Sequence, residues 1–432
     1  MTADRTRHFR FLFATLGSLG DLHPYIAVAR ELVARGHQAV IASAEDYRAP
    51  VESAGAEFAA VGPTMASFGD YRALIVRLFD GHRGPEFLMR ELVMPHLHAA
   101  YEGLERAAAG ADVLVSHPLA VTLPLLAQRR NLPWVSTVLA PLSLMSYCDP
   151  PVIAGAPWLR HLRLLGPGIY GALFGLIKRS THHWEAPLRK FRAELGLPPD
   201  DRLAMFEGQF SPRLNLALFD APLALLQPDW PPNTRACGSP IFDGAAPEAR
   251  VSDDVARFLD AGEPPIVFAL GSSAVWIAGD FWTHAAAAAQ QLGRRALLVT
   301  GPVLPQDLPE GVRAFPYVPY SQVFPRASAV VHQAGIGTLA QALRAGRPQL
   351  IVPVAFDQPD NARRAQALGL ARVLPFRKAN ARQLAAELAA LFAGPGYAGA
   401  ARAVAETLQP VDGAACAAKE LIACAAAACK IG

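Results

Sequence analysis

The sequence is poor in cysteine and carries almost no net charge. Only 5 of its 432 residues are cysteines, and no two of them form a Cys-x-x-Cys pair. This pattern argues against a disulfide framework and a cysteine-based zinc site, and it is typical of reduced thiols in the cytoplasm. The 40 basic and 37 acidic residues leave a formal charge of +3. Such a small, dispersed excess gives no reason to expect a nucleic-acid partner.

The sequence also lacks a long hydrophobic run. The N-terminus, MTADRTRHFR, is polar and only a short apolar run follows it, so we expect no signal peptide. The most lipid-like stretch, 164–177, contains Pro167 and several glycines. It falls short of the roughly 20 apolar residues that span a bilayer. We therefore expect a cytoplasmic protein without stable membrane insertion, although this stretch could touch a membrane surface or an oily ligand.

Buried strands and amphipathic helices alternate in the first part of the chain. Residues 9–16 (FRFLFATL) are typical of a parallel strand that is buried on both faces. A glycine-containing turn follows, then apolar residues at helical spacing up to Val33, then a second strand at 38–42. This is a βαβ unit. Later strands at 113–115 and 133–138, with a helix at 119–128 between them, extend the same sheet.

The alternation fails between 141 and 203 and then restarts. That interval is rich in Leu, Pro, Trp and Phe, with one helix expected near 181–195. A proline-rich stretch, Gln227–Pro232, is interpreted as a linker. Beyond it we expect strands at 266–270, 296–299, 312–315, 329–331 and 349–352. The sequence thus predicts an α/β protein with two doubly wound domains, over residues 1–226 and 241–410, a linker over 227–240 and a helical tail over 411–432.

Two facing sheets of this kind imply a cleft between the domains. In open parallel sheets, ligands bind beyond the carboxyl ends of the strands. Two such edges would hold two ligands across one cleft, which suits the transfer of a group from one molecule to another.

Two strand ends in the second half carry candidate binding residues. After the strand that ends near His332, a small-residue turn leads into a helix that begins near Gly337, and a helix start binds anions. After the next strand, Asp357 and Gln358 offer the acceptors and donors that suit a sugar. On local pattern alone, each stretch is also compatible with an ordinary helix cap. The two motifs together, one strand apart on the same sheet edge, favour a binding site.

The stretch from Tyr317 to Asn361 resembles the donor-binding segment of the family 1 glycosyltransferases (the UDP-glycosyltransferase superfamily), which have the GT-B fold of two facing Rossmann-like domains. The resemblance implies that Tyr317 stacks on the nucleotide base and that the backbone of Val318 pairs with the base edge. Gln333 stands where members usually carry a diphosphate-binding His, and Gln341 where many carry a ribose-binding Glu. The other residues that match the donor site are Gly335, Gly337, Thr338, Asp357 and Gln358.

The same resemblance assigns the catalytic groups to the first domain. Asp21 matches the general base of antibiotic-type, sterol-type and rhamnosyl-transferring members, with Gly20 beside it in the donor site. His117, at another strand end, would pair with Asp21 in exchanged roles, because many members hold an Asp there. His23 is a weaker alternative base. From the residues alone, Asp21 could equally cap the helix that follows it, and His117 could simply be hydrogen-bonded.

Ser272 and Ser273 follow the strand at 266–270, and the resemblance places their turn near the diphosphate, although a plain strand-to-helix turn fits equally well. No paired Asp motif follows a strand, so we expect no metal and no cofactor besides the nucleotide-sugar co-substrate. The helix N-terminus would hold the leaving diphosphate.

The expected activity is inverting transfer of a hexose or 6-deoxyhexose to a hydroxyl of an apolar small molecule by a monomer or homodimer. dTDP-rhamnose is the favoured donor and UDP-glucose the alternative, and a flavonoid, macrolide, sterol or hydroxy-acyl lipid would be the acceptor. Less favoured are a nucleotide-sugar epimerase or hydrolase and a noncatalytic sugar-binding protein. A nicotinamide dehydrogenase is disfavoured, because the first turn lacks the third glycine of its phosphate-binding motif.

Overall fold

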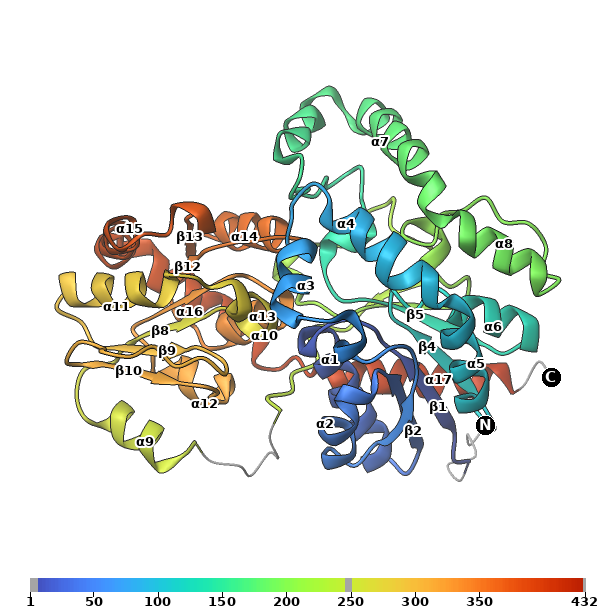
Figure 1. Cartoon of the computed structure of the whole chain (residues 1–432), viewed down its shortest axis with the longest axis horizontal. Helices are drawn as coiled ribbons and strands as arrows, with labels where there is room; N and C mark the ends of the chain where they lie inside the picture. The colour runs from blue at the N-terminus through green and yellow to red at the C-terminus, as the bar shows by residue number, and fades with distance from the viewer. Residues whose placement is uncertain (1–6, 245–250, 430–432) are drawn as a thin grey trace.

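The computed structural model describes residues 7–244 and 251–429, which form two α/β domains beside each other (Figure 1). The first domain contains a seven-stranded parallel sheet in the order β3-β2-β1-β4-β5-β6-β7. Its strands are β1 (Arg10–Ala14), β2 (Gln38–Ser43), β3 (Glu57–Ala60), β4 (Val113–Ser116), β5 (Trp134–Val138), β6 (Asn215–Ala217) and β7 (Thr234–Ala236).

Helices cover both faces of this sheet, so its central strands are buried. Phe11, Leu12 and Phe13 of β1 are almost fully buried, and alternate residues enter two different apolar cores, as a doubly wound sheet requires. The helices are α1 (Leu19–Ala34), α2 (Arg48–Ser53), α3 (Tyr71–Leu78), α4 (Gly84–Phe87), α5 (Leu97–Ala107), α6 (Leu123–Arg130), α7 (Pro167–Thr181) and α8 (Ala186–Glu194).

The second domain repeats the architecture with a six-stranded parallel sheet in the order β10-β9-β8-β11-β12-β13. Its strands are β8 (Ile266–Ala269), β9 (Ala296–Val299), β10 (Val312–Phe315), β11 (Ala329–His332), β12 (Gln349–Ile351) and β13 (Ala371–Val373). Its helices, with the last helix of the chain, are α9 (Asp253–Asp260), α10 (Gly271–Ala274), α11 (Phe281–Gln291), α12 (Tyr320–Val323), α13 (Ile336–Arg344), α14 (Gln358–Ala367), α15 (Ala381–Ala393), α16 (Pro395–Leu408) and α17 (Gly413–Ala428).

The chain crosses between the domains twice. The expectation of a plain linker over 227–240 is wrong at Thr234–Ala236, which pairs with β6 as the edge strand β7 of the first sheet. The crossing therefore begins after Ala236. The second crossing precedes α17, which lies along the first domain in Figure 1. Leu421 of α17 is buried in the same apolar cluster as Ile26 and Leu32 of α1. The helical tail expected over 411–432 is thus, as far as residue 429, a structural part of the first domain.

The interval 141–203 contains more helix than the sequence suggested. In place of the single helix expected at 181–195, the structure has a short turn followed by α8. An additional helix, α7, precedes this turn and projects from the first domain (Figure 1). Tyr170 and Phe174 of α7 pack with Leu203 and Phe206 in a small separate core. Within the described residues, no helix is both long and apolar enough to cross a membrane.

Candidate active site

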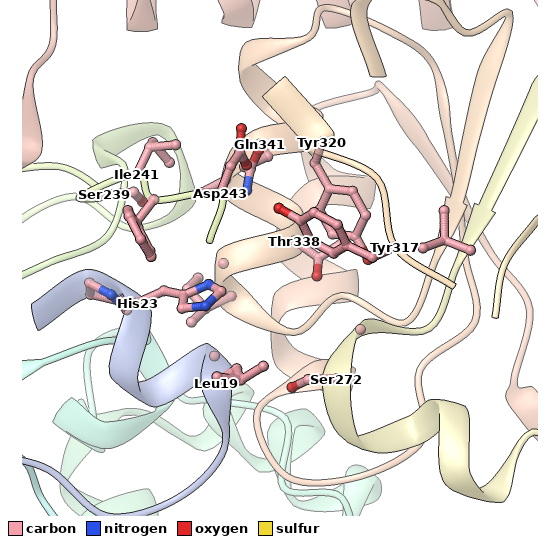
Figure 2. A pocket seen from close by; sticks show the side chains of 18 of the residues that line it. Leu19, His23, Ser239, Ile241, Asp243, Ser272, Tyr317, Tyr320, Thr338 and Gln341 are labelled. Carbon is pink, nitrogen blue, oxygen red and sulfur yellow. The ribbon is translucent and has the colours of Figure 1, made fainter. Parts of the chain in front are cut away.

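A cavity of about 300 Å³ lies between the two domains, at the carboxyl ends of the strands (Figure 2). The N-terminus of α1 forms one wall, the crossing segment 239–243 forms another, and turns of the second domain complete it. Seven residues of the predicted donor site line this cavity, namely Gly20, Ser272, Tyr317, Val318, Gly337, Thr338 and Gln341.

The turn between β11 and α13 is built to leave backbone N–H groups for a ligand. Gly335 caps α13 without a side-chain hydrogen bond to the first turn. Ala334 adopts a left-handed conformation (φ +65°), which is uncommon for a residue with a side chain. It is held there by its N–H, which donates to His332 Nδ1 (3.1 Å), and by its carbonyl, which accepts from Asn361 Nδ2 (2.9 Å). The helix N-terminus is therefore held in position for an anion.

His332 supports this turn from inside the sheet and does not face the cavity. It is fully buried, and its Nε2 lies 3.0 Å from Gln349 Oε1. Burial lowers the pKa of His332 to about 4, although the hydrogen bond to Gln349 raises it, so the imidazole is neutral at physiological pH. The strand geometry thus places His332 on the opposite side from the ligand, as the alternation of side chains predicts.

Gln333 fills the space between two glycine-containing turns. Its side chain is 5% exposed, and its Oε1 is buried without a hydrogen-bond partner among the described residues. A Cβ at Gly271 would lie 2.2 Å from Gln333 Nε2, and one at Gly335 would lie 2.9 Å from it. Gly271 also has a left-handed backbone (φ +67°). Only glycine at 271 lets the α10 turn approach Gln333 this closely.

Ser272 and Ser273, which were both predicted for the donor site, have different surroundings in the structure. Ser272 is exposed and lines the cavity, whereas Ser273 interacts with the hydroxyl of Tyr71 on α3 of the first domain. Beside them, the rings of Tyr71 and Trp276 meet edge to face, with centroids 5.1 Å apart. Ser273 therefore helps to hold the two domains together, and Ser272 is the serine available to a ligand.

Asp357 is the N-cap of α14 and Gln358 is the first residue of that helix, and neither residue lines the cavity. Asp357 Oδ2 accepts from Asn361 Nδ2 (2.7 Å). Gln358 Oε1 accepts from the N–H groups of Val354 (2.9 Å) and Ala355 (3.3 Å). The side-chain oxygen of Gln358 thus fixes the backbone of the preceding loop at Val354 and Ala355. The side-chain nitrogen of Gln358 is the group that could donate to a ligand.

Asp21 and His117 meet at the carboxyl ends of β1 and β4. His117 Nε2 lies 3.4 Å from Asp21 Oδ1. Asp21 Oδ2 accepts from the N–H (2.7 Å) and the hydroxyl (3.0 Å) of Ser18. Asp21 is the third residue of α1, which begins at Leu19 with Ser18 as its N-cap. Asp21 therefore takes part in a capping box and also pairs with His117, so the capping and pairing roles coexist.

The backbone around the pair fixes its geometry. Gly17 has a φ of +131°, and a Cβ there would lie 2.3 Å from Asp21 Oδ2. Only glycine lets the Asp21 carboxylate fold back over this turn. His117 Nδ1 accepts from the N–H of Leu119 (3.2 Å), so the ring proton of a neutral His117 sits on Nε2, facing Asp21.

The pKa of Asp21 is lowered by its partners. Burial raises it, but the hydrogen bond and charge of His117 and the hydrogen bonds of Ser18 outweigh burial. Asp21 is consequently a carboxylate at neutral pH, and 35% of its side chain is exposed to solvent.

Asp21 and Asp357 interact across the gap between the domains. Burial raises the pKa of Asp357 to about 7, the hydrogen bond from Asn361 opposes this, and the negative charge of Asp21 adds to the rise. The charge of Asp21 in the first domain thus contributes to keeping the Asp357 carboxyl group protonated at higher pH.

The sequence did not single out Asp243, which lies on the crossing segment and lines the cavity. Its only sequence signal is a carboxylate between Phe242 and Gly244, without helical or strand periodicity. His23, the weaker alternative base, lines the same cavity and packs edge to face on Phe242 (5.2 Å between centroids). Burial lowers the pKa of His23 to about 4, against the charge of Asp243, so it is neutral.

Two parts of the sequence match known protein families. Residues 11–83 match the glycosyltransferase family 28 N-terminal domain. Residues 301–423 match the C-terminal domain of erythromycin biosynthesis protein CIII-like proteins. The chain is 34% identical to O-mycaminosyltylonolide 6-deoxyallosyltransferase of Streptomyces fradiae, over 92% of this chain and 93% of that protein. It is 28% identical to vancomycin aglycone glucosyltransferase of Amycolatopsis orientalis, over 96% of this chain and 97% of that protein.

Solved structures share the two-domain fold. Spinosyn rhamnosyltransferase SpnG superimposes with a TM-score of 0.68 at 21% identity, covering 96% of this chain and 100% of that one. Glycosyltransferase VinC, solved with dTDP, gives a TM-score of 0.68 at 20% identity, with 96% and 99% coverage.

Proposed function

The chain belongs to the family 1 glycosyltransferases with the GT-B fold, of the antibiotic type, and from this premise we propose that it moves a 6-deoxyhexose from a dTDP-sugar to a hydroxyl of an apolar natural product with inversion at the anomeric carbon. The observation that carries the proposal is the meeting of Asp21 and His117 at the carboxyl ends of β1 and β4, next to Gly20 in the cavity lining. Beside that meeting point lies a cavity that ends at the N-terminus of α13.

The nucleotide sugar binds mainly to the second domain in this scheme. Tyr317 and Val318 hold the base, and the N–H groups at the start of α13 hold the diphosphate, with Thr338 adding a hydroxyl. Gln333 contributes a neutral donor where a cationic His would bind more strongly. Asp357 and the amide nitrogen of Gln358 hold the hydroxyls of the transferred sugar.

The acceptor hydroxyl attacks the anomeric carbon from the side of the first domain. Its oxygen forms a bond to that carbon while the bond from the carbon to the diphosphate oxygen breaks, and its proton passes to a carboxylate oxygen of Asp21. The nucleoside diphosphate leaves with the bonding electron pair towards the α13 N-terminus, which stabilises its charge without a need for a metal. A single displacement of this kind inverts the anomeric centre.

Asp21 acts through its position more than through intrinsic basicity. Since its partners lower its pKa, it is a weak base towards a free alcohol. It accepts the proton as the new carbon–oxygen bond forms, when the hydroxyl has become acidic. His117 keeps Asp21 oriented and ionised through Nε2.

Two observations support the choice of donor and acceptor. The Streptomyces fradiae relative is named for a 6-deoxyallosyl group and O-mycaminosyltylonolide, and VinC binds dTDP. We keep rhamnose as the favoured 6-deoxyhexose, because residues 317–321 (YVPYS) and 340–343 (AQAL) resemble the corresponding stretches of rhamnolipid-type and bacterial flavonoid rhamnosyltransferases. UDP-glucose is the alternative donor, since another relative is a glucosyltransferase.

A panel of donors and acceptors, analysed by mass spectrometry, tests the proposal. We expect a product whose mass rises by one 6-deoxyhexosyl unit when dTDP-rhamnose and a macrolide or flavonoid are both present, and NMR should show an inverted anomeric centre. Release of free or epimerised sugar, independent of acceptor, would favour an epimerase or hydrolase instead. Transfer from UDP-glucose alone would support the alternative donor.

A further inference from the structure

Asp243 lines the cavity and carries a carboxylate oxygen without a hydrogen-bond partner among the described residues. It lies on the segment that crosses from β7 to the second domain, and its Oδ2 accepts from the N–H of Ser321 in α12 (3.2 Å). Its Oδ1 is buried and has no hydrogen-bond partner among the described residues. Asp243 takes part in no ion pair within the described part of the chain.

A buried acceptor without a donor is costly, so most such atoms in native proteins are paired. Gln341 Oε1, on α13, is a second buried and unpaired acceptor in the lining of the same cavity. Figure 2 shows both side chains among the residues around the pocket. Two residues of the lining thus carry unpaired acceptors, which a ligand with two donors would satisfy.

The negative charge of Asp243 contributes to raising the pKa of two tyrosines at this end of the cavity. Burial and the Asp243 carboxylate raise the pKa of Tyr317 to about 12. The pKa of Tyr320 is also raised, first by burial, then by Tyr317 and Asp243. The nearby His23 is neutral. None of these groups is a cation, so a hydrogen-bond donor from a ligand would stabilise Oδ1.

Of the parts of a nucleotide, the pentose supplies such donors. A diphosphate has no donor at neutral pH and would be repelled by a carboxylate. A pyrimidine imide offers one N–H. The 2′-deoxyribose of dTDP offers a 3′-hydroxyl to one acceptor, and the ribose of UDP adds a neighbouring 2′-hydroxyl for the second.

We propose that Asp243 is a specificity-determining residue whose Oδ1 accepts a hydrogen bond from the pentose 3′-hydroxyl of the donor nucleotide. Gln341 then takes the 2′-hydroxyl where the nucleotide is a ribonucleotide. The inference rests on the proposed donor site and deepens it, because Asp243 belongs to the segment between the domains and not to the donor-binding stretch 317–361.

A thermodynamic cycle, in which two nucleotides are each bound to two variants of the protein, tests this contact. Calorimetry measures the dissociation constants of dTDP and 2′,3′-dideoxythymidine diphosphate for the wild type and for Asp243→Asn. We expect the wild type to lose roughly tenfold to a hundredfold in affinity when the 3′-hydroxyl is removed, as for a hydrogen bond to a charged acceptor. Asp243→Asn should bind the two nucleotides with nearly equal, weak affinity.

The matched control is Asp280→Asn, which changes an exposed carboxylate of the second domain outside the cavity lining. It should keep the wild-type difference between the nucleotides. Equal affinity of the wild type for both nucleotides would overturn the inference without any variant. An unchanged ratio in a folded Asp243→Asn would also overturn it and would point to the base. If the wild type binds dTDP, UDP and their sugars not at all, the proposed donor site itself fails.

Discussion

Asp21 has hydrogen-bond partners on both carboxylate oxygens, and its ionisation depends on them. Ser18 donates to Oδ2, and His117 lies beside Oδ1. The folded pKa of Asp21 is below its unfolded value of 3.8. These contacts therefore stabilise the fold at pH values above 3.8, and their contribution is lost as the pH falls through the folded pKa.

Removal of His117 should shift the pH profile of the enzyme. In His117→Leu, burial and the remaining Ser18 contacts act on Asp21 without the lowering effect of His117, so the pKa of Asp21 rises. The acidic limb of the kcat/KM profile should then move to higher pH, with a lower plateau. In His117→Gln, which retains a donor, the limb should move less. Superimposable profiles for the wild type and both variants would remove His117 as the positioning residue.

Asp357 should discriminate the sugar from the bare nucleotide. In Asp357→Ala the carboxylate that we assign to sugar hydroxyls is lost, so affinity for the dTDP-sugar should fall roughly tenfold or more. Affinity for dTDP should change by no more than about threefold, because the base and diphosphate contacts lie elsewhere. Calorimetry with the two ligands checks this, and equal losses would argue against a sugar contact.

At the scale of elements, the proposed diphosphate site depends on how two turns pack around the side chain of Gln333. Gln333 lies between the turns that begin α10 and α13, and both turns contain glycine at the point of contact. Each turn is an ordinary connection between a strand and a helix. Their close approach around Gln333 is what creates a donor surface for an anion.

Gly271→Ala should weaken nucleotide binding through Gln333. The new methyl group would overlap Gln333 Nε2 and displace that side chain, while the left-handed backbone adds about 1 kcal/mol of strain. We expect a loss of roughly tenfold in dTDP affinity, comparable to one lost hydrogen bond. Gly293→Ala is the matched control, because Gly293 has a similar φ of +60° and open space where its methyl group would lie. It should cost similar stability and leave dTDP affinity unchanged; equal binding losses would refute a role for Gln333.

Elements with a strong apolar pattern could be predicted from the sequence, and weakly patterned ones could not. The strand expected at 266–270 forms as β8 over Ile266–Ala269, because a fully buried strand needs a continuous apolar run. The edge strand β7 has three residues, two of them exposed, and follows a proline-rich stretch. Neither its length nor its burial pattern distinguishes it from a linker. The alanine-rich α17 was expected as a helix, but its pattern did not reveal that it packs on α1.

The lining of the cavity was predictable where it consists of residues that directly follow a strand. Seven predicted residues line the cavity because each lies on a local strand–turn–helix unit or the loop beside one. Asp243 could not be found in this way, since its place depends on a crossing segment that folds between two domains. The place of the Asp357 loop against the first domain likewise depends on contacts between the domains, such as the hydrogen bond from Val152 to Asp360.

At the scale of the whole molecule, buried ion pairs hold the domains together. Arg364 of α14 donates to Asp360 Oδ2 through Nε (2.6 Å) and to the carboxylate of Asp149 in the first domain. Asp360 Oδ1 also accepts from the N–H of Val152 (3.0 Å). Asp360 is fully buried and Arg364 is 5% exposed. This network fixes α14, and with it the loop of Asp357, against the first domain.

Arg364→Met should destabilise the closed arrangement of the domains. It removes the closer of the two cations beside the buried Asp360, and breaking a buried ion pair typically costs about 3–5 kcal/mol. Thermal unfolding should begin at a lower temperature than in the wild type, and the two domains should unfold in separate transitions. Arg363→Met is the control, because Arg363 contacts Asp149 and Asp360 at 3.4 Å and is 20% exposed. If both variants unfold like the wild type, the network does not hold the domains.

The central claim is that the Asp21 carboxylate takes the proton of an acceptor hydroxyl beside a sugar nucleotide held by the second domain. The most direct test measures turnover and dTDP affinity of Asp21→Asn on the same preparation. We predict that kcat falls about 100-fold to 10,000-fold, the usual contribution of a general base, while the Kd for dTDP stays within about threefold. Turnover equal to that of the wild type would contradict the account.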